Sequence, residues 1–150
     1  MILMQRYFQM LKQNPSLLLF GAWLMAVAAM LGSLYFSNIL HYPPCDLCYW
    51  QRIATYPIVA IIFVGLWRKD ENVVHYVLPL AIFGFVVSIY HNLIYYKVIP
   101  EVIKACANGV SCTTKYPEVM GMSIPLMSLL SYIVMICLCI LYQRLTATKK

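Results

Sequence analysis

The sequence predicts an all-α protein, built as a four-helix transmembrane bundle. Of the 150 residues, 63% are hydrophobic and only 11% are charged, whereas soluble domains carry about a quarter charged residues. The few charges also divide the chain into four long uncharged stretches. Each stretch is long enough for a membrane-spanning helix, which needs about 20 predominantly apolar residues. This composition argues against a soluble enzyme.

The four spans follow one another along the chain with short connections. We expect them at residues 16–40, 49–67, 73–96 and 123–142. The charged turn at 68–72 makes the second and third spans an antiparallel pair. The first span resembles a signal peptide, but its apolar stretch exceeds the usual length of about 7–15 residues, so we expect it to be retained. Residues 1–150 are therefore expected to form one integral membrane domain.

The positive charges predict the orientation of the spans. The formal net charge is +6, but the cations lie at the ends of the apolar stretches, where they indicate topology rather than nucleic-acid binding. With the amino terminus inside, seven of the 11 Lys and Arg residues face the cytoplasm. We therefore expect both termini in the cytoplasm of a plasma-membrane protein, and two extracytoplasmic loops at 41–48 and 97–122.

The six cysteines fall into two groups. Two of them, Cys137 and Cys139, lie in the fourth span, where we interpret them as packing residues. The other four form one pair in each outer loop: Cys45 with Cys48, and Cys106 with Cys112. Cysteines on the oxidising side of a membrane are expected to form disulfides. Purely structural disulfides are one explanation of this pattern.

The first pair has the spacing of a redox-active disulfide. Cys45 and Cys48 form a C-x-x-C sequence, in which thiol pKa values are commonly lowered. Pro43 and Pro44 favour an extended entry into a helix. The unpaired N–H groups at the start of that helix would stabilise a thiolate.

Two polar residues at similar depth point to a ligand in the membrane. Arg52 follows Cys48 by four residues and shares its helix face. A cation inside a membrane span is a functional hypothesis by default, and Arg52 would stabilise a Cys48 thiolate and the developing charge on a quinone. His91 would donate a hydrogen bond to the same ligand. The alternatives are an interface anchor for Arg52 and a structural histidine for His91.

These features together resemble a known family. The segment at 44–52, with Pro44, Cys45, Leu47, Cys48 and Arg52, resembles the P-C-x-L-C-x-x-x-R signature of the disulfide bond formation protein B (DsbB) family. The resemblance covers nearly the whole chain. The second pair resembles that of the BdbC branch from Gram-positive bacteria. Two departures are the short spacing of the second pair and Gln51, which replaces an acidic residue often found there.

The resemblance implies a quinone-dependent protein-disulfide oxidoreductase. It would reoxidise an extracytoplasmic thioredoxin-fold thiol oxidase (DsbA- or BdbD-like) and pass the electrons to menaquinone or ubiquinone. This activity would support disulfide formation in exported proteins. Its catalytic residues would be Cys45, Cys48, Cys106 and Cys112, paired 45–48 and 106–112, with Arg52 and His91 at the quinone and no metal.

Two other classes of protein remain as alternatives. Two cysteine pairs can form a four-sulfur zinc site, which predicts a metal-binding membrane protein. Two structural disulfides would instead fit a membrane protein without enzymatic activity. The related vitamin K epoxide reductases share the redox logic, but their C-x-x-C near the end of the bundle is absent here, where the fourth span carries C-x-C.

Overall fold

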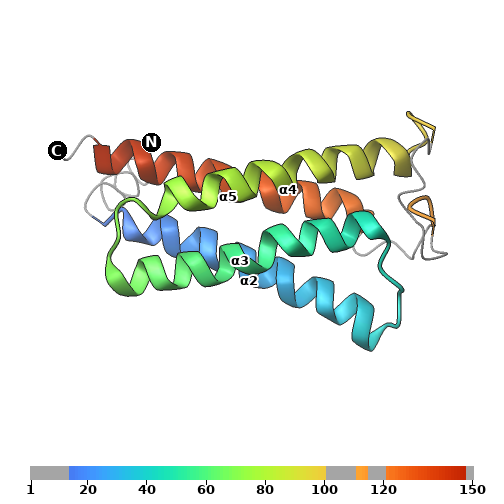
Figure 1. Cartoon of the computed structure of the whole chain (residues 1–150), viewed down its shortest axis with the longest axis horizontal. Helices are drawn as coiled ribbons and strands as arrows, with labels where there is room; N and C mark the ends of the chain where they lie inside the picture. Colours follow the sequence, from blue (N-terminus) through green and yellow to red (C-terminus); the bar gives the residue numbers. More distant parts are fainter. Residues whose placement is uncertain (1–13, 101–110, 115–120, 148–150) are drawn as a thin grey trace.

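The computed structural model describes residues 14–100, 111–114 and 121–147 of the chain. These residues form a bundle of long helices (Figure 1). The long helices are α2 (Ser16–Leu34), α3 (Asp46–Arg68), α4 (Val73–Tyr95) and α5 (Ile124–Ala147), and a π-helical turn, η1 (Tyr35–Ile39), continues α2. By length and composition, all four can cross a membrane. The predicted all-α, four-helix class is confirmed.

The helices match the predicted spans to within one residue, except that α3 starts earlier and α5 ends later. Helix α3 begins at Asp46 rather than at residue 49, and α5 continues to Ala147 rather than ending at 142. The reason is that a charged residue marks the edge of the hydrocarbon layer without ending a helix. Arg68 and Arg144 lie in the last turns of α3 and α5, where a cation interacts favourably with the helix dipole and stabilises the helix end.

The helices form a ring: α3 packs against α2 and α4, α4 packs against α5, and α5 closes the ring against α2. The turn between α3 and α4 lies at the same end as the start of α2 and the end of α5 (Figure 1). The α2–α3 connection and residues 111–114 lie at the opposite end, so the two predicted outer loops share one end of the bundle. Which end faces the cytoplasm stays a prediction.

Small residues allow the helices to approach closely. Ala22, Ala26 and Ala81 are fully buried in the core. A Cβ atom added to Gly84 in α4 would overlap the ring of Tyr132 in α5. Small residues at helix contacts are typical of membrane bundles. Large apolar side chains instead cover the outside, as expected for a surface in lipid: Phe63, Val64, Trp67, Ile82, Phe83 and Val86 are all exposed.

Candidate redox site at one end of the bundle

The C-x-x-C pair lies where α3 begins. Cys45 is the N-cap residue, with extended backbone angles (φ −75°, ψ 167°), and Asp46 opens the helix. The preceding Pro43 and Pro44 lie outside regular helix, as predicted. One helical turn separates the two cysteines, and their Sγ atoms lie 3.2 Å apart. The five cysteines of the described residues are thiols in this structure.

Cys112 brings the second outer loop to the first pair. Its side chain is buried and packs in one cluster with Cys45, Leu47 and Ile94. The Cys112 thiol also makes a hydrogen bond with Cys45. Its predicted partner, Cys106, lies outside the described residues, so the 106–112 pairing stays a prediction. The structure therefore brings together three of the four predicted catalytic cysteines.

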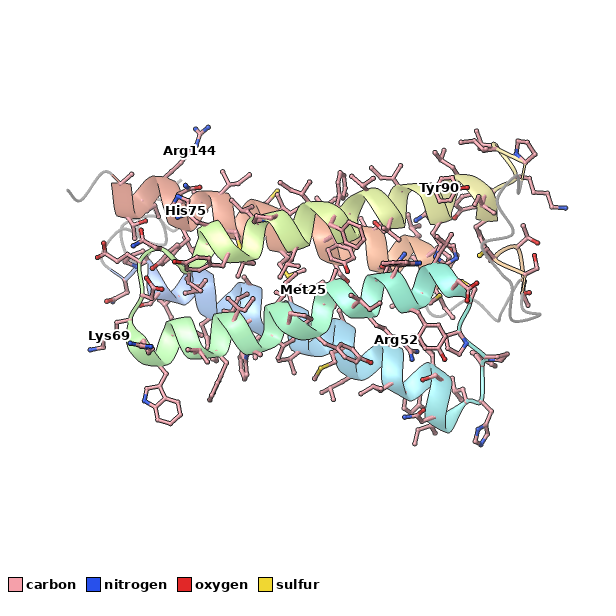
Figure 2. All side chains as sticks on the ribbon, in the orientation of Figure 1. Met25, Arg52, Lys69, His75, Tyr90 and Arg144 are labelled. Carbon is pink, nitrogen blue, oxygen red and sulfur yellow. The ribbon has the colours of Figure 1, made fainter. Side chains whose placement is uncertain are left out.

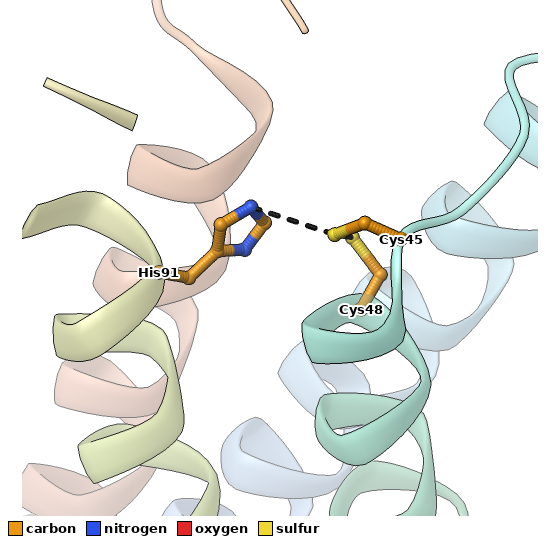
Figure 3. A group of neighbouring side chains, drawn as sticks. All are labelled: Cys45, Cys48 and His91. Atoms are coloured by element: carbon orange, nitrogen blue, oxygen red, sulfur yellow. Dashed lines mark hydrogen bonds between the residues drawn. The ribbon is translucent and has the colours of Figure 1, made fainter. Parts of the chain in front are cut away.

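His91 reaches the same sulfur from α4. Its side chain is buried, and its Nε2 lies 3.7 Å from Cys45 Sγ (Figure 3). Hydrogen bonds from the Cys112 and Cys48 thiols lower the pKa of the Cys45 thiol well below its usual value, and His91 lowers it further. Burial opposes this shift but does not outweigh it. This lowered pKa favours the thiolate of Cys45, the reactive form of a cysteine.

Arg52 connects α3 to α2. Its Nε donates to Ser33 Oγ at 2.8 Å, and an Nη donates to the Ser33 carbonyl oxygen at 3.0 Å. Its guanidinium also lies 5.6 Å from the centre of the Tyr49 ring. Arg52 lies toward the end of the bundle that carries the cysteines, whereas Lys69 and Arg144 lie at the other end (Figure 2).

A cavity of about 310 Å³ lies beside the cysteines. Arg52, Cys48 and His91 contribute to its lining, as do Cys45 and Cys112. Most of the remaining wall is apolar, with Met25, Ala28, Ala29, Phe36, Met127 and Met135 among its residues. Its size and mixed lining are typical of small-molecule sites, which commonly have volumes of about 300–1,000 Å³. The cavity suits a flat apolar ring that carries hydrogen-bond acceptors.

A buried polar network supports this site, and sequence reasoning did not identify most of it. Gln51 contacts His91 through its side-chain amide and accepts a hydrogen bond from Ser128 of α5. The Gln51 carbonyl oxygen accepts hydrogen bonds from Tyr132 and Thr55. The available signal was the occurrence of polar residues inside apolar spans, since such residues are costly in a membrane unless they are partnered.

The structure also bears on the remaining cysteines and on metal binding. Cys139 is fully buried in the core, whereas Cys137 is exposed. Among the described residues, the donor atoms of Cys45, Cys48 and His91 all lie within 4.8 Å of one another. Two thiolates and an imidazole are donors that suit zinc. If the protein binds a metal, these three side chains are therefore the candidate ligands in this structure.

Comparison with known proteins identifies the family. Four helices that can cross a membrane, with a C-x-x-C pair at one end, are the features expected of a membrane disulfide oxidoreductase. The family profile of disulfide bond formation protein DsbB matches residues 15–142, and the chain belongs to this family. It is 44% identical over 118 residues to probable disulfide formation protein C 2 of Bacillus cereus, which covers 78% of this chain and 84% of the relative.

Two further relatives extend this similarity. Disulfide bond formation protein C of Bacillus subtilis is 41% identical over 133 residues, or 86% of this chain and 95% of the relative. A probable disulfide formation protein of Coxiella burnetii is 37% identical over 132 residues, or 85% of this chain and 86% of the relative. No solved structure matches the chain. The protein is thus a multi-pass membrane protein of disulfide bond formation.

Proposed function

We propose that this protein reoxidises an extracytoplasmic thioredoxin-fold thiol oxidase and delivers the electrons to a membrane quinone. The observation that carries the proposal is the position of Cys45 and Cys48. Cys45 hydrogen-bonds Cys112 of the second loop, and Cys48 lines the apolar cavity together with Arg52. The pair thus lies between the loop that would meet the partner and the cavity that would hold the quinone.

The proposed route begins at the second loop. A thiolate of the reduced partner attacks the Cys106–Cys112 disulfide at Cys106, which forms a mixed disulfide and releases Cys112 as a thiolate. The second thiol of the partner then attacks the partner sulfur of that bond. The partner leaves oxidised, and Cys106 and Cys112 remain reduced. Two electrons and two protons have entered the protein.

Exchange between the loops follows through sulfurs that are in contact. The Cys112 thiolate attacks Cys45, forms a Cys45–Cys112 disulfide and releases Cys48 as a thiolate. Cys106 then attacks Cys112, which restores the 106–112 disulfide and releases Cys45. The low pKa of Cys45 makes it a good leaving group in this second step. The electrons now reside on Cys45 and Cys48, beside the cavity.

The cavity residues fit a quinone. Apolar walls would contact its ring, and Arg52 would donate hydrogen bonds to its carbonyl oxygens. His91 would donate one as well whenever Cys45 is held in a disulfide and does not accept that hydrogen bond. A bound quinone would supply the two-electron, two-proton acceptor that regenerates the Cys45–Cys48 disulfide. Arg52 is held against Ser33 of α2 by two hydrogen bonds, so its cation is fixed in place before a ligand arrives.

The test mixes the purified protein, a reduced thioredoxin-fold oxidase and a soluble quinone, and follows quinone absorbance. We expect turnover that is abolished by Cys45→Ser, Cys48→Ser, Cys106→Ser or Cys112→Ser. The matched control is Cys137→Ser, because Cys137 is exposed on α5 away from the site. Full turnover by Cys48→Ser would exclude the proposed route.

Arg52 provides a second arm of this experiment. Arg52→Ala removes the cation from the cavity wall, and we expect KM for quinone to rise by about 10- to 100-fold, the range for losing a charged hydrogen bond. Ser33→Ala keeps the cation and removes only one of its acceptors. It should have a smaller effect. Equal effects of the two variants would mean that Arg52 serves only to join α2 to α3.

Metal binding is the second candidate, because the three donor atoms of Cys45, Cys48 and His91 are clustered. The two functions separate in one preparation. Stoichiometric zinc in the purified protein, with no quinone turnover, would favour a metal site. Extractable quinone and turnover without added metal would favour the oxidoreductase.

A further inference from the structure

A chain of hydrogen bonds runs from α5 through α3 to α4 and ends on Cys45. Ser128 Oγ donates to Gln51 Oε1 at 2.7 Å. Gln51 Nε2 lies 3.4 Å from His91 Nδ1, and His91 Nε2 lies 3.7 Å from Cys45 Sγ. Gln51, His91 and Cys45 are 8%, 4% and 7% exposed, so water has little access to these contacts.

The orientation of the Gln51 amide, with its oxygen toward Ser128 and its nitrogen toward His91, sets the direction of each bond. The Ser128 hydroxyl donates to the oxygen of the Gln51 amide, which turns the amide nitrogen toward His91. An amide NH₂ group can only donate, so His91 Nδ1 accepts through its lone pair. A neutral imidazole with a lone pair on Nδ1 carries its proton on Nε2. The nitrogen that faces Cys45 is therefore an N–H donor.

Further contacts hold the Gln51 backbone in place. Its carbonyl oxygen accepts hydrogen bonds at 2.9 Å from both Tyr132 Oη and Thr55 Oγ1. Tyr132 Oη and Thr55 Oγ1 are themselves 2.8 Å apart. Helix α5 thus contacts both the side chain and the backbone of Gln51. Hydrogen bonds that are shielded from water in this way are strengthened by the low local dielectric constant.

We propose that Gln51, oriented by Ser128, is a positioning residue that fixes His91 as the neutral Nε2–H tautomer. His91 then donates a hydrogen bond to the Cys45 sulfur whenever that sulfur is a thiolate. The inference rests on the proposed function in taking Cys45–Cys48 as a redox pair. Because the donor stabilises the reduced form, it makes this pair more oxidising. The Nε2–H tautomer also directs an N–H group, rather than a lone pair, toward the sulfurs. This opposes metal binding by His91.

The first test reads the tautomer directly. Nitrogen NMR shifts of ¹⁵N-histidine-labelled protein distinguish protonated from unprotonated ring nitrogens, and the His91→Phe variant assigns the signals. In the reduced wild-type protein, we expect Nε2 protonated and Nδ1 unprotonated. In Gln51→Glu, the carboxylate can only accept, so Nδ1 should become protonated. A wild-type His91 that is protonated on Nδ1 would overturn the proposal.

The second test measures the reduction potential of the Cys45–Cys48 pair against glutathione. Gln51→Met removes the amide at similar size, and we expect the equilibrium to shift about tenfold toward the disulfide, or about 30 mV more negative. Ser128→Ala should shift it less, in the same direction. The double variant should shift no further than Gln51→Met alone, because both changes act through one contact.

The chain offers a matched control at its other end. Gln143 and His75 form a second glutamine–histidine contact, with 3.2 Å between Gln143 Nε2 and His75 Nε2, but it is exposed. Gln143→Met should leave the potential unchanged. An unchanged potential in folded Gln51→Met, or an equal shift in Gln143→Met, would refute the inference. Failure of the proposed function would appear separately, as a wild-type protein that reduces no quinone while its His91 tautomer is as expected.

Discussion

Cys45 receives contacts from three parts of the chain: Cys48 one turn along α3, His91 in α4 and Cys112 in the second loop. Burial alone would keep a thiol protonated. Here the hydrogen bonds outweigh burial, and the pKa of Cys45 falls. The sequence had instead suggested a stabilised thiolate at Cys48 beside Arg52. Arg52 contacts Ser33 and Tyr49 in the structure, and the stabilising contacts converge on Cys45.

The relative strength with which these contacts lower the Cys45 pKa predicts how Cys45 responds to substitution. Because its pKa is lowered, Cys45 in the reduced wild-type protein should keep its alkylation rate to lower pH than an ordinary thiol does. Cys112→Ala removes the strongest lowering contact. We expect it to move the alkylation midpoint to higher pH, and by more than His91→Ala does. The measurement is the iodoacetamide labelling rate of the Cys45 peptide by mass spectrometry. A larger shift in His91→Ala would contradict this order.

At the scale of the elements, the packing of α5 against α3 and α4 supports the site. Tyr132 of α5 lies against Gly84 of α4 and donates to the Gln51 carbonyl oxygen of α3. Asn92 of α4 donates to the Pro125 carbonyl oxygen at the start of α5, at 2.8 Å. These contacts fix α5 at the height where Ser128 meets Gln51. The site is therefore sensitive to spacing between helices that carry none of its sulfurs.

Gly84→Ala tests this dependence. The added methyl group would overlap the Tyr132 ring, and overpacking of this kind typically costs about 1–3 kcal/mol. We expect a lower thermal unfolding midpoint in detergent and slower quinone reduction. Gly21→Ala is the matched control, since its Cβ would lie at an ordinary 3.7 Å from Leu138 Cδ1. Equal stability of the two variants would argue against close α4–α5 packing.

For the whole molecule, the sequence predicted the bundle well because membrane spans obey simple rules of length and charge. It also grouped Cys45, Cys48 and Arg52, which lie close together in sequence and line one cavity in the structure. It did not predict the contacts of Gln51 with Ser128 and His91, which lie 77 and 40 residues away along the chain. Such contacts depend on the rotation of each helix about its axis. The α-helical hydrophobic periodicity that would reveal this rotation is weak when lipid and core are both apolar.

The orientation of the bundle is a prediction for the whole molecule. Lys69 precedes α4 and Lys97 follows it, so the two residues lie at opposite ends of this helix. Both have a positive φ (53° and 58°), which makes them a matched pair for labelling. In intact cells, a membrane-impermeant maleimide should label Lys97→Cys and leave Lys69→Cys unlabelled, as read peptide by peptide. The reverse pattern would place the reactive cysteines in the cytoplasm and contradict the proposed function.

In the proposed route, electrons pass between the two loops through Cys45 and Cys112. The most direct measurement is mass spectrometry of the Cys48→Ser/Cys106→Ser variant after mild oxidation, which leaves Cys45 and Cys112 as the outer thiols. We predict a Cys45–Cys112 disulfide in high yield, and little Cys48–Cys112 disulfide in the matched Cys45→Ser/Cys106→Ser variant. Preferential formation of the Cys48–Cys112 disulfide would exclude this route.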